Sequence, residues 1–412
     1  MFAPGFTRER CRHVPERLFE RDVVVVGGCG RVGLPLGIAL AQAGLRTTAF
    51  DINPAAVDVV NGATMPFDEP DADWRLEEVR ESGMFDASTD PAVLSTAEHV
   101  IVVVGTPVDE HLNPDPQVVR DAIKGFAHHL RDGQVLILRS TVFPGVTRLV
   151  EQFIRSTGLA IDVSFCPERI AEGKAFVELY ELPQIVSART ERAVERAIAL
   201  FKNIAQEIVE LSPEEAELAK LFTNTWRYIR FAAANQLYMI ANDYGLDFER
   251  IRAGLRQNYP RAADMPGAGL AAGPCLLKDT MQLAAFHENK FTLGHASMMV
   301  NEGLPLYIVG RMESEYDLSK LTVGLLGMAF KAESDDIRSS LSYKLRRILR
   351  FKAANVLCSD PYVKDASFVS LDVALEHADV LVIGAPHEAY RQFTTTKPVI
   401  DIWNARGQGV RI

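Results

Sequence analysis

Residues 22–33 read DVVVVGGCGRVG, and this stretch decides the fold of the first part of the chain. A short apolar run ends in the pattern G-x-G-x-x-G, and an apolar segment of helix length follows. Glycines permit a tight turn between a strand and a helix, and they let a pyrophosphate approach the backbone at the helix N-terminus. A glycine-rich turn without a ligand is the alternative, but the order of strand, turn and helix favours a dinucleotide site formed by Gly28, Gly30, Arg31, Val32 and Gly33.

An acidic residue stands at the end of the next predicted strand, Thr47–Phe50. A carboxylate at this place, Asp51, accepts hydrogen bonds from ribose hydroxyls and repels a 2′-phosphate, so the sequence predicts NAD rather than NADP. Two further loops, one containing Thr106 and one containing Thr141, follow apolar runs. Because ligands bind beyond the C-terminal ends of parallel strands, both threonines are predicted to complete the cofactor site, with plain turn chemistry as the alternative.

The same order of strand, helix-length segment, strand and aspartate recurs near the C-terminus. There Leu321–Leu326 ends in Gly327, and Val356–Ser359 is followed by Asp360. Strands rich in β-branched residues that alternate with helix-length segments are typical of parallel βαβ units. The predicted fold class is therefore α/β, with two doubly wound Rossmann-like domains joined by a central helical domain. We divide the chain into an N-terminal extension (1–20), an NAD-binding Rossmann domain (21–205), a central helical domain (206–315) and a C-terminal α/β domain (316–412).

The central part of the chain, from about Leu211 to Arg311, has helical periodicity and no clear strand. A long helix is predicted to begin at Ser212, where serine can cap, Pro213 suits the first helical position and Glu215 completes a capping box. This helix is expected to end near Asp243, which makes it about 45 Å long. Its apolar, aromatic-rich surface predicts burial between domains or across a dimer interface.

The composition limits the classes of ligand and partner. The chain has 412 residues, which suggests two or three domains, and its formal net charge of -10 argues against binding to nucleic acid or an anionic membrane. No apolar run is long enough to cross a membrane, and residues 1–20 lack the apolar core of a signal peptide, so a cytoplasmic location is expected. The 5 cysteines are too widely spaced for a disulfide framework or a zinc site, and no metal is predicted.

A cysteine in a glycine-rich segment is the first candidate for catalysis. Residues 273–279 read GPCLLKD, so Cys275 has little steric cover, and the neighbouring Lys278 is expected to favour its thiolate. Taken alone, a buried structural cysteine is the alternative. On the predicted long helix, Lys220 and Asn224 share one face at i and i+4, where burial is costly unless a polar group meets them. The alternative is that Lys220 extends to solvent and Asn224 caps a neighbouring loop.

In combination, these segments resemble the UDP-glucose/GDP-mannose dehydrogenase family over nearly the whole chain after residue 20. The resemblance rests on several motifs in order: VVVVGGCGRVGLPL (23–36), RSTVFPGVT (139–147), CPERIAEGKA (166–175), ELAKLFTNTWR (217–227), GPCLLKD (273–279), GMAFKAESDDIRSS (327–340) and SDPYV (359–363). It implies an NAD-dependent enzyme whose C-terminal domain binds the uridine diphosphate of a UDP-sugar.

The resemblance also implies a four-electron oxidation of the sugar C6 hydroxyl to a carboxylate. Cys275 would hold the aldehyde as a thiohemiacetal, and a second oxidation would leave a thioester that water hydrolyses, which divides one difficult oxidation into two. Lys220 would stabilise the oxyanion, and Asp279 with Lys220 would position or deprotonate water. Asn224 would hold substrate oxygens, and Glu168 would activate water or contact the substrate.

Further ligand contacts follow from the resemblance. Lys331 and Arg338 match substrate contacts of the C-terminal domain, with an ion pair of Arg338 to Asp335 or Asp336 as the alternative. Arg261 is the candidate for an arginine before the cysteine loop, although its spacing to the cysteine is not the usual one. The predicted cofactor contacts are Gly28, Gly30, Arg31, Val32, Gly33, Asp51, Thr106, Thr141 and Lys278, and the predicted substrate contacts are Glu168, Lys220, Asn224, Arg261, Gly273, Lys331 and Arg338.

The motifs give mixed indications of the sugar. Residues 166–169 and 106–111 resemble enzymes that act on N-acetylated hexosamines, whereas Pro274 and Lys278 do not. We therefore expect a UDP-N-acetylhexosamine (UDP-ManNAc or UDP-GlcNAc), oxidised for cell-surface polysaccharide precursors, with UDP-glucose as the alternative.

Two rival functions remain. A two-electron 3-hydroxy-acid dehydrogenase also pairs a dinucleotide domain with a helical Lys-x-x-x-Asn domain, but it needs neither a reactive cysteine nor a second α/β domain. A catalytically silent sensor of NAD or nucleotide sugars is the other rival, although every proposed reactive position is filled. The expected partners are a UDP-sugar and a second copy of the chain, in a homodimer built on the central helix, and no nucleic acid or membrane.

Overall fold

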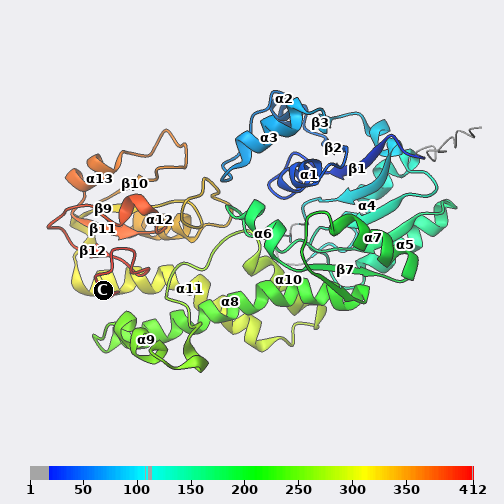
Figure 1. Cartoon of the computed structure of the whole chain (residues 1–412). Coiled ribbons are helices and arrows are strands. Elements are labelled where there is room, and N and C mark those ends of the chain that lie inside the picture. The colour runs from blue at the N-terminus through cyan, green and yellow to red at the C-terminus, as the bar shows by residue number, and fades with distance from the viewer. Residues whose placement is uncertain (1–17, 107, 110–113, 411) are drawn as a thin grey trace, which may run out of the picture.

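The computed structural model describes residues 18–106, 108, 109, 114–410 and 412. Residues 1–17 of the predicted N-terminal extension, including Cys11, lie outside the described residues, as do Pro107 and the pair Glu110–His111. The described chain forms two α/β lobes, and the long helix α8 (Pro213–Asp243) runs from one lobe to the other (Figure 1). The predicted fold class is confirmed by a parallel sheet in each lobe with helices between them.

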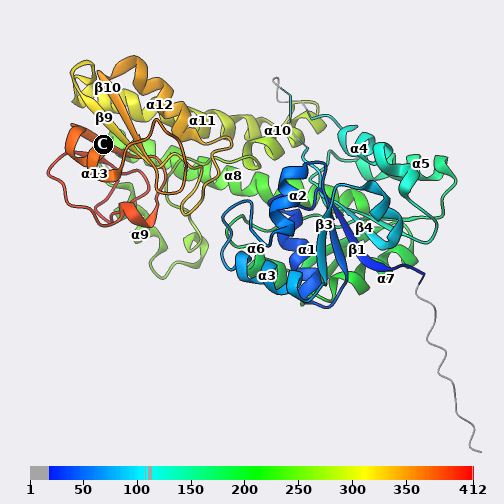
Figure 2. The ribbon, with the colours of Figure 1, turned by 90° about the horizontal axis from the view of Figure 1, so that it is seen from above.

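The N-terminal lobe (residues 18–211) is built on an 8-stranded sheet in the order β3-β2-β1-β4-β5-β6-β7-β8, parallel except between β6 and β7. The strands are β1 (Arg21–Val26), β2 (Thr47–Phe50), β3 (Phe85–Ser88), β4 (Ala97–Val102), β5 (Val135–Leu138), β6 (Asp162–Phe165), β7 (Gln184–Ala188) and β8 (Ile208–Leu211). The helices are α1 (Gly33–Gln42), α2 (Pro54–Asn61), α3 (Ala72–Glu81), α4 (Val118–Phe126), α5 (Val146–Thr157), α6 (Ala175–Glu181) and α7 (Glu191–Phe201), and they cover both faces of the sheet (Figure 2).

Strand β1 is an uninterrupted run of valines because both of its faces are buried. Val24 and Val26 pack in the core on one side of the sheet, and Val23 and Val25 pack in the core on the other side. In register, Val26 lies beside Phe50 of β2 on one side and Val102 of β4 on the other. The loops that follow these three strands therefore meet at one edge of the sheet.

Strand β8 extends the N-terminal sheet to Leu211, beyond the predicted domain limit at residue 205. It pairs in parallel with β7, from Gln184 beside Ile208 to Ser187 beside Leu211. Two of its four residues are exposed, as expected for a short edge strand, and a strand so little buried lacks the apolar pattern by which strands are predicted.

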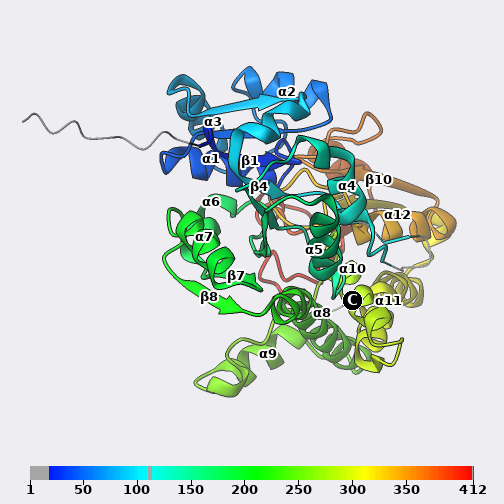
Figure 3. The same ribbon diagram turned by 90° about the vertical axis from the view of Figure 1, so that its right-hand side faces the viewer.

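The helical region consists of α8, α9 (Phe248–Arg256), α10 (Leu276–Phe286) and α11 (Thr292–Glu315). The predicted start of α8 is confirmed, because the Glu215 carboxylate accepts hydrogen bonds from the Ser212 N–H at 2.8 Å and from the Ser212 hydroxyl at 2.7 Å. Its predicted end at Asp243 is also confirmed. Helices α8, α10 and α11 lie side by side next to the N-terminal lobe (Figure 3).

The C-terminal lobe (residues 322–412) has a parallel sheet of 4 strands in the order β10-β9-β11-β12. Its elements are β9 (Thr322–Leu326), α12 (Leu341–Lys352), β10 (Asn355–Ser359), α13 (Leu371–His377), β11 (Val380–Ile383) and β12 (Val399–Ile400). As predicted, β9 and β10 pair as β1 and β2 do in the N-terminal lobe.

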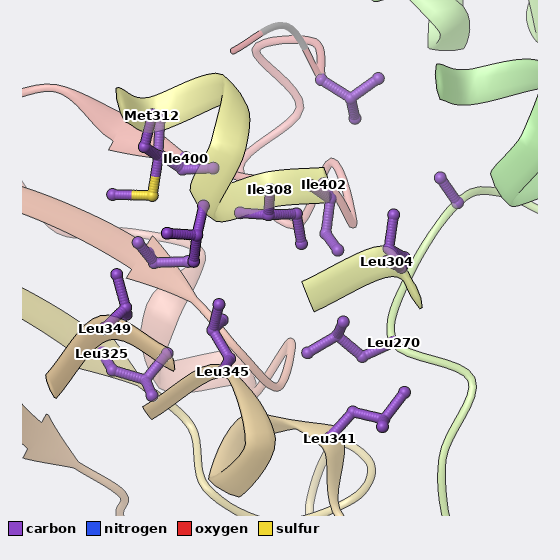
Figure 4. Packing of buried hydrophobic residues seen from close by; sticks show 14 of the residues in the cluster. Leu270, Leu304, Ile308, Met312, Leu325, Leu341, Leu345, Leu349, Ile400 and Ile402 are labelled. Carbon is purple, nitrogen blue, oxygen red and sulfur yellow. The ribbon is translucent and has the colours of Figure 1, made fainter. Parts of the chain in front are cut away.

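One apolar core joins the C-terminal lobe to the helical region. Figure 4 shows Leu304, Ile308 and Met312 of α11 in one cluster with leucines of α12, with Ile400 of β12 and with Ile402, which follows that strand; Leu270 of the glycine-rich loop lies beside them. The lobe and the helices thus share one packed interior. Among the described residues, no helix combines the length and apolar character needed to traverse a bilayer.

Candidate functional site

The glycine loop after β1 has the close packing that its sequence predicts. A Cβ on Gly28 would lie 2.6 Å from Ala49 Cα, and one on Gly33 would lie 2.4 Å from the Gly27 carbonyl oxygen, so neither position has room for a side chain. A Cβ on Gly30 would meet no atom closer than 3.5 Å. The N-cap residue of helix α1, Val32, has no side chain that could accept a hydrogen bond from the N–H groups of the first turn. A loop that leaves space above Gly30 and an uncapped helix N-terminus fit the pyrophosphate of NAD.

The Asp51 carboxylate stands at the end of β2 beside this loop. It accepts hydrogen bonds from the Cys29 N–H at 3.2 Å and from the Asn53 N–H at 3.1 Å. Burial, and then the nearby Asp51 charge, raise the pKa of the Cys29 thiol to about 12, so Cys29 is a neutral packing residue. The structure therefore brings Asp51 next to the residues predicted to bind the pyrophosphate.

Arg31, a predicted cofactor contact, is paired with carboxylates outside the glycine loop. Its guanidinium donates to Glu172 Oε1 at 2.5 Å and to Asp335 Oδ1 at 2.8 Å, and it stacks over the Phe67 ring. Asp335 belongs to the C-terminal lobe, so Arg31 connects the two lobes in this structure. The sequence missed this role because pairs between residues so far apart leave no local pattern.

The predicted substrate contacts of the C-terminal lobe converge on Glu172. Lys331 Nζ donates to the Glu172 carbonyl oxygen, and an Arg338 guanidinium nitrogen lies 3.7 Å from a Glu172 carboxylate oxygen. Arg338 Nε also donates to Asp336 at 2.9 Å, which is the ion pair considered as the alternative from the sequence. Burial raises the pKa of Glu172, with the Asp336 charge as the next cause.

The glycine-rich loop before Cys275 is held from two sides. Asn235 of α8 accepts from the Gly269 N–H at 2.9 Å and donates to the Gly269 carbonyl at 3.0 Å. From the C-terminal lobe, the Ser339 carbonyl accepts from the Gly273 N–H at 3.3 Å. Gly273 has a φ of 104°, and a Cβ there would lie 2.7 Å from the Phe330 ring. The helical region and the C-terminal lobe thus jointly position the loop that leads to the thiol.

Asp279 is a fully buried carboxylate one turn after Cys275 on α10. The Asn224 amide donates to its Oδ2 at 2.6 Å, and Lys278 Nζ lies 2.9 Å from its Oδ1. The ammonium is near Oδ1 but not in hydrogen-bond geometry, so this oxygen is a buried acceptor without a hydrogen-bond donor among the described residues. It could therefore orient a water molecule.

Lys220 lies one turn before Asn224 on the same face of α8. The residue is 9% exposed, and no group in the described ranges forms a hydrogen bond or ion pair with its ammonium. Its positive charge acts on Cys275, so an oxyanion formed on a substrate at that sulfur would be stabilised.

The electrostatic environment of Cys275 differs from the expectation that a neighbouring lysine would favour thiolate. Cys275 is solvent-exposed, yet the surrounding protein desolvates its sulfur enough that burial, followed by the Asp279 charge, raises the thiol pKa above 9.0. The positive charges of Lys220, Lys278 and Arg338 act in the opposite direction without reversing the net shift. The resting group is thus a neutral thiol.

The two threonine loops predicted for the cofactor reach the cysteine helix. The Thr106 hydroxyl donates to the Thr141 carbonyl at 2.6 Å, and Lys278 Nζ donates to the Thr106 hydroxyl at 3.4 Å. Residues from two lobe loops and from α10 therefore form one hydrogen-bonded group.

Two predicted site residues are engaged elsewhere. Glu168 is buried, with one carboxylate oxygen paired with Arg139 and the other accepting from the backbone N–H groups of Arg169 and Ile170. Arg261 Nε donates to the Tyr259 hydroxyl at 2.7 Å, within its own loop. The sequence analysis did not identify Arg139 as a residue that holds Glu168. The arginine is buried beside Ser140 and Thr141, and a buried guanidinium requires a carboxylate partner. Within the described residues, no cluster of acidic residues, histidine and cysteine is able to hold a metal ion.

Comparison with known proteins covers nearly the whole chain. Residues 22–205, 214–302 and 324–407 match the NAD binding, central and UDP binding domains of the UDP-glucose/GDP-mannose dehydrogenase family. A UDP-N-acetyl-D-mannosamine dehydrogenase of Yersinia pestis is 30% identical over 92% of this chain and 96% of its own length.

Solved structures agree with this similarity. The UDP-D-ManNAc dehydrogenase of Pyrococcus horikoshii superposes with a TM-score of 0.87 at 27% identity, covering 93% of this chain and 96% of the other. A UDP-glucose dehydrogenase of Pyrobaculum islandicum also has a TM-score of 0.87, at 25% identity, covering 95% and 97%.

The spacing in the glycine loop predicts different effects for two alanine substitutions. Gly30→Ala should leave the melting temperature unchanged but weaken NAD binding about tenfold or more, because its methyl group takes the space that the pyrophosphate needs. Gly33→Ala should lower both the melting temperature and the affinity for NAD, since its Cβ overlaps the Gly27 carbonyl. Gly125→Ala, at an open position in α4, is the control. Calorimetry that finds unchanged NAD affinity for Gly30→Ala would place the pyrophosphate elsewhere.

The charges around Cys275 predict a pH-dependent reaction with iodoacetamide. With the thiol pKa above 9.0, less than about 1% is thiolate at pH 7, and the alkylation rate should rise with pH beyond 9. Asp279→Asn removes a negative charge and should speed alkylation at pH 8, whereas Lys278→Met should slow it. A Cys11→Ser background leaves Cys275 as the exposed thiol, since Cys29, Cys166 and Cys358 are buried. Equal rates in both variants would contradict the assigned electrostatics.

Proposed function

The chain belongs to the UDP-glucose/GDP-mannose dehydrogenase family, and from that membership we propose that it oxidises C6 of a UDP-N-acetylhexosamine to a carboxylate through a covalent intermediate on Cys275. It is an NAD-dependent UDP-sugar dehydrogenase. The observation that carries the mechanism is the exposed Cys275 thiol one turn from the buried Asp279, with the unpaired Lys220 on the adjoining helix face.

The proposed reaction has two oxidations and one hydrolysis. NAD, held by the glycine loop and Asp51, would supply the hydride acceptor for each oxidation at C6. Between them, the Cys275 sulfur adds to the aldehyde carbon, the carbon–oxygen double bond becomes a single bond, and the thiol proton passes to that oxygen to give the thiohemiacetal. Lys220 stabilises the oxygen of the thiohemiacetal and, later, of the tetrahedral intermediate formed when water attacks the thioester. That attack breaks the carbon–sulfur bond and regenerates the thiol.

Asp279 and Asn224 have proposed roles in the hydrolysis. The Asp279 oxygen that lacks a hydrogen-bond donor can orient the attacking water, while the Asn224 amide restrains the carboxylate and faces the substrate. Glu168, held by Arg139, shapes the 166–174 loop that contacts the sugar. The substrate diphosphate would bind Lys331 and Arg338 by exchanging their contacts with Glu172. Arg261 and Gly273 remain proposed substrate contacts.

The choice of sugar rests on relatives and motifs. Relatives from Pyrococcus horikoshii and Yersinia pestis are UDP-N-acetyl-D-mannosamine dehydrogenases, which favours UDP-ManNAc. UDP-glucose is the second candidate. Lys278 does not resemble the enzymes that act on N-acetylated hexosamines, and a UDP-glucose dehydrogenase superposes as well as the UDP-D-ManNAc dehydrogenase does. The proposed product is a uronic acid precursor for cell-surface polysaccharide, made in the cytoplasm.

A homodimer through the helical region is also proposed. Phe222, Trp226, Leu237 and Ile240 form an exposed apolar stripe along α8, and Leu293, Met299 and Leu306 of α11 are exposed as well. Large apolar side chains exposed along one face of a helix are typical of an interface between proteins.

The stoichiometry of turnover tests the reaction. Offered UDP-ManNAc, UDP-GlcNAc, UDP-glucose and GDP-mannose in turn, the enzyme should reduce about two NAD per sugar, fastest with UDP-ManNAc, as measured by absorbance and mass spectrometry. Cys275→Ser should abolish steady acid formation, and Asp279→Asn should accumulate a sugar–protein adduct. Cys358→Ser, at a buried cysteine of the C-terminal lobe, is the matched control. About one NAD per substrate would instead indicate a two-electron dehydrogenase, and no turnover would indicate a sensor.

Light scattering tests the dimer. The wild-type protein should have about twice the mass of one chain, and Trp226→Glu should shift it towards the monomer, because Trp226 is 60% exposed in the single chain and its burial would exclude a charge. Phe351→Glu, at an exposed apolar residue of α12, is the control. A monomeric wild-type protein would rule out this interface.

A further inference from the structure

Glu217 is a buried carboxylate that holds the loop carrying Thr141. It is 1% exposed. Its Oε2 accepts from the Gly145 N–H at 2.6 Å, and its Oε1 accepts from the Thr147 N–H at 2.8 Å and the Thr147 hydroxyl at 2.6 Å. These donors lie at the N-terminus of α5, where a negative charge is stabilised.

Glu217 lies on the face of α8 that carries Lys220 and Asn224. The spacings i, i+3 and i+7 align these three residues along one side of the helix, over about 10 Å. The helix that supplies the oxyanion-stabilising ammonium thus also anchors a loop of the N-terminal lobe.

The contacts of this face close into a ring that starts and ends on α8. From Glu217 the ring passes through the 140–147 loop to the Thr141 carbonyl, which accepts from the Thr106 hydroxyl. The Thr106 hydroxyl accepts from Lys278 Nζ, which pairs with Asp279, and Asp279 accepts from Asn224 on α8. Lys220 lies on α8 between Glu217 and Asn224, the two residues at which this series of contacts begins and ends.

We propose that Glu217 is a positioning residue: it fixes the cofactor loop containing Thr141 relative to the catalytic face of α8. The inference rests on the proposed function of this site, and it adds a residue that neither contacts the sugar nor reacts. Loss of Glu217 would let the 140–147 loop shift relative to Lys220, so that NAD would bind weakly and out of alignment with the substrate.

The test compares Glu217→Gln with Glu151→Gln. A glutamine at 217 turns an NH2 donor towards one of the N–H donors. Glu151 of α5, 7% exposed, instead pairs its carboxylate with Arg189 at 2.6 Å and accepts no hydrogen bond from the described residues of the loop. Both variants should lower the melting temperature. Glu217→Gln alone should weaken NADH binding, measured by fluorescence without sugar, about tenfold, and should raise the KM for NAD more than that for the UDP-sugar. The alkylation rate of Cys275 should stay unchanged.

Equal NADH affinities in the two variants would overturn the proposal and leave Glu217 a residue of stability alone. If Glu217→Gln does not fold, Thr147→Val decides, because it removes one of the three contacts and should weaken NADH binding about threefold. Thr147→Val with wild-type affinity would then reject the proposal. NADH binding is measured without sugar. If the wild-type enzyme oxidised no UDP-sugar, the proposed function would be rejected, but the role of Glu217 in NADH binding could still be tested.

Discussion

The burial of Asp279 is the constraint on which the site depends. A carboxylate without exposed surface is tolerated only with close partners, and removal of a partner from a buried charge costs about 3–5 kcal/mol. Asn224 is the partner that crosses from α8 to α10, since Lys278 lies on α10 beside Asp279, so the two helices cannot separate without losing the Asn224 contact. Cys275 stands one turn before Asp279, and Lys220 one turn before Asn224. One buried charge therefore sets the distance between the nucleophile and the ammonium.

Burial of the Cys275 sulfur, and next the Asp279 charge, favour the neutral thiol. Partial burial and Asp279 together outweigh three nearby cations, and the pKa of Cys275 rises. A permanently ionised, exposed cysteine would be open to oxidation. A thiol that loses its proton only as it adds to an aldehyde avoids that hazard, and it needs the ammonium of Lys220 more than it needs a low pKa.

Local sequence patterns predicted the parts of this structure that depend on local contacts. The capping box at Ser212 located the start of α8, and the strand–glycine–helix order located the loop at Gly30, because both signals come from residues a few positions apart. Prediction was weaker wherever a side chain has partners from distant segments. Arg31 reads as a phosphate contact but pairs with Glu172 and Asp335, and Glu168 reads as a reactive carboxylate but is enclosed by Arg139 and backbone amides. The net shift at Cys275 likewise required distances to every nearby charge, which spacing along the chain does not provide.

The C-terminal lobe contacts α11 through apolar side chains and the N-terminal lobe through charged ones, and these two kinds of contact differ in strength. The lobe packs against α11 through leucine and isoleucine side chains. Full burial of each such side chain contributes about 1.5–3 kcal/mol to stability. Towards the N-terminal lobe it is held by partly exposed contacts such as Arg31–Asp335, each worth about 0–1 kcal/mol and weakened by salt. Any separation of the two lobes is therefore expected to break these ionic contacts before the apolar core, and to become easier as the salt concentration rises.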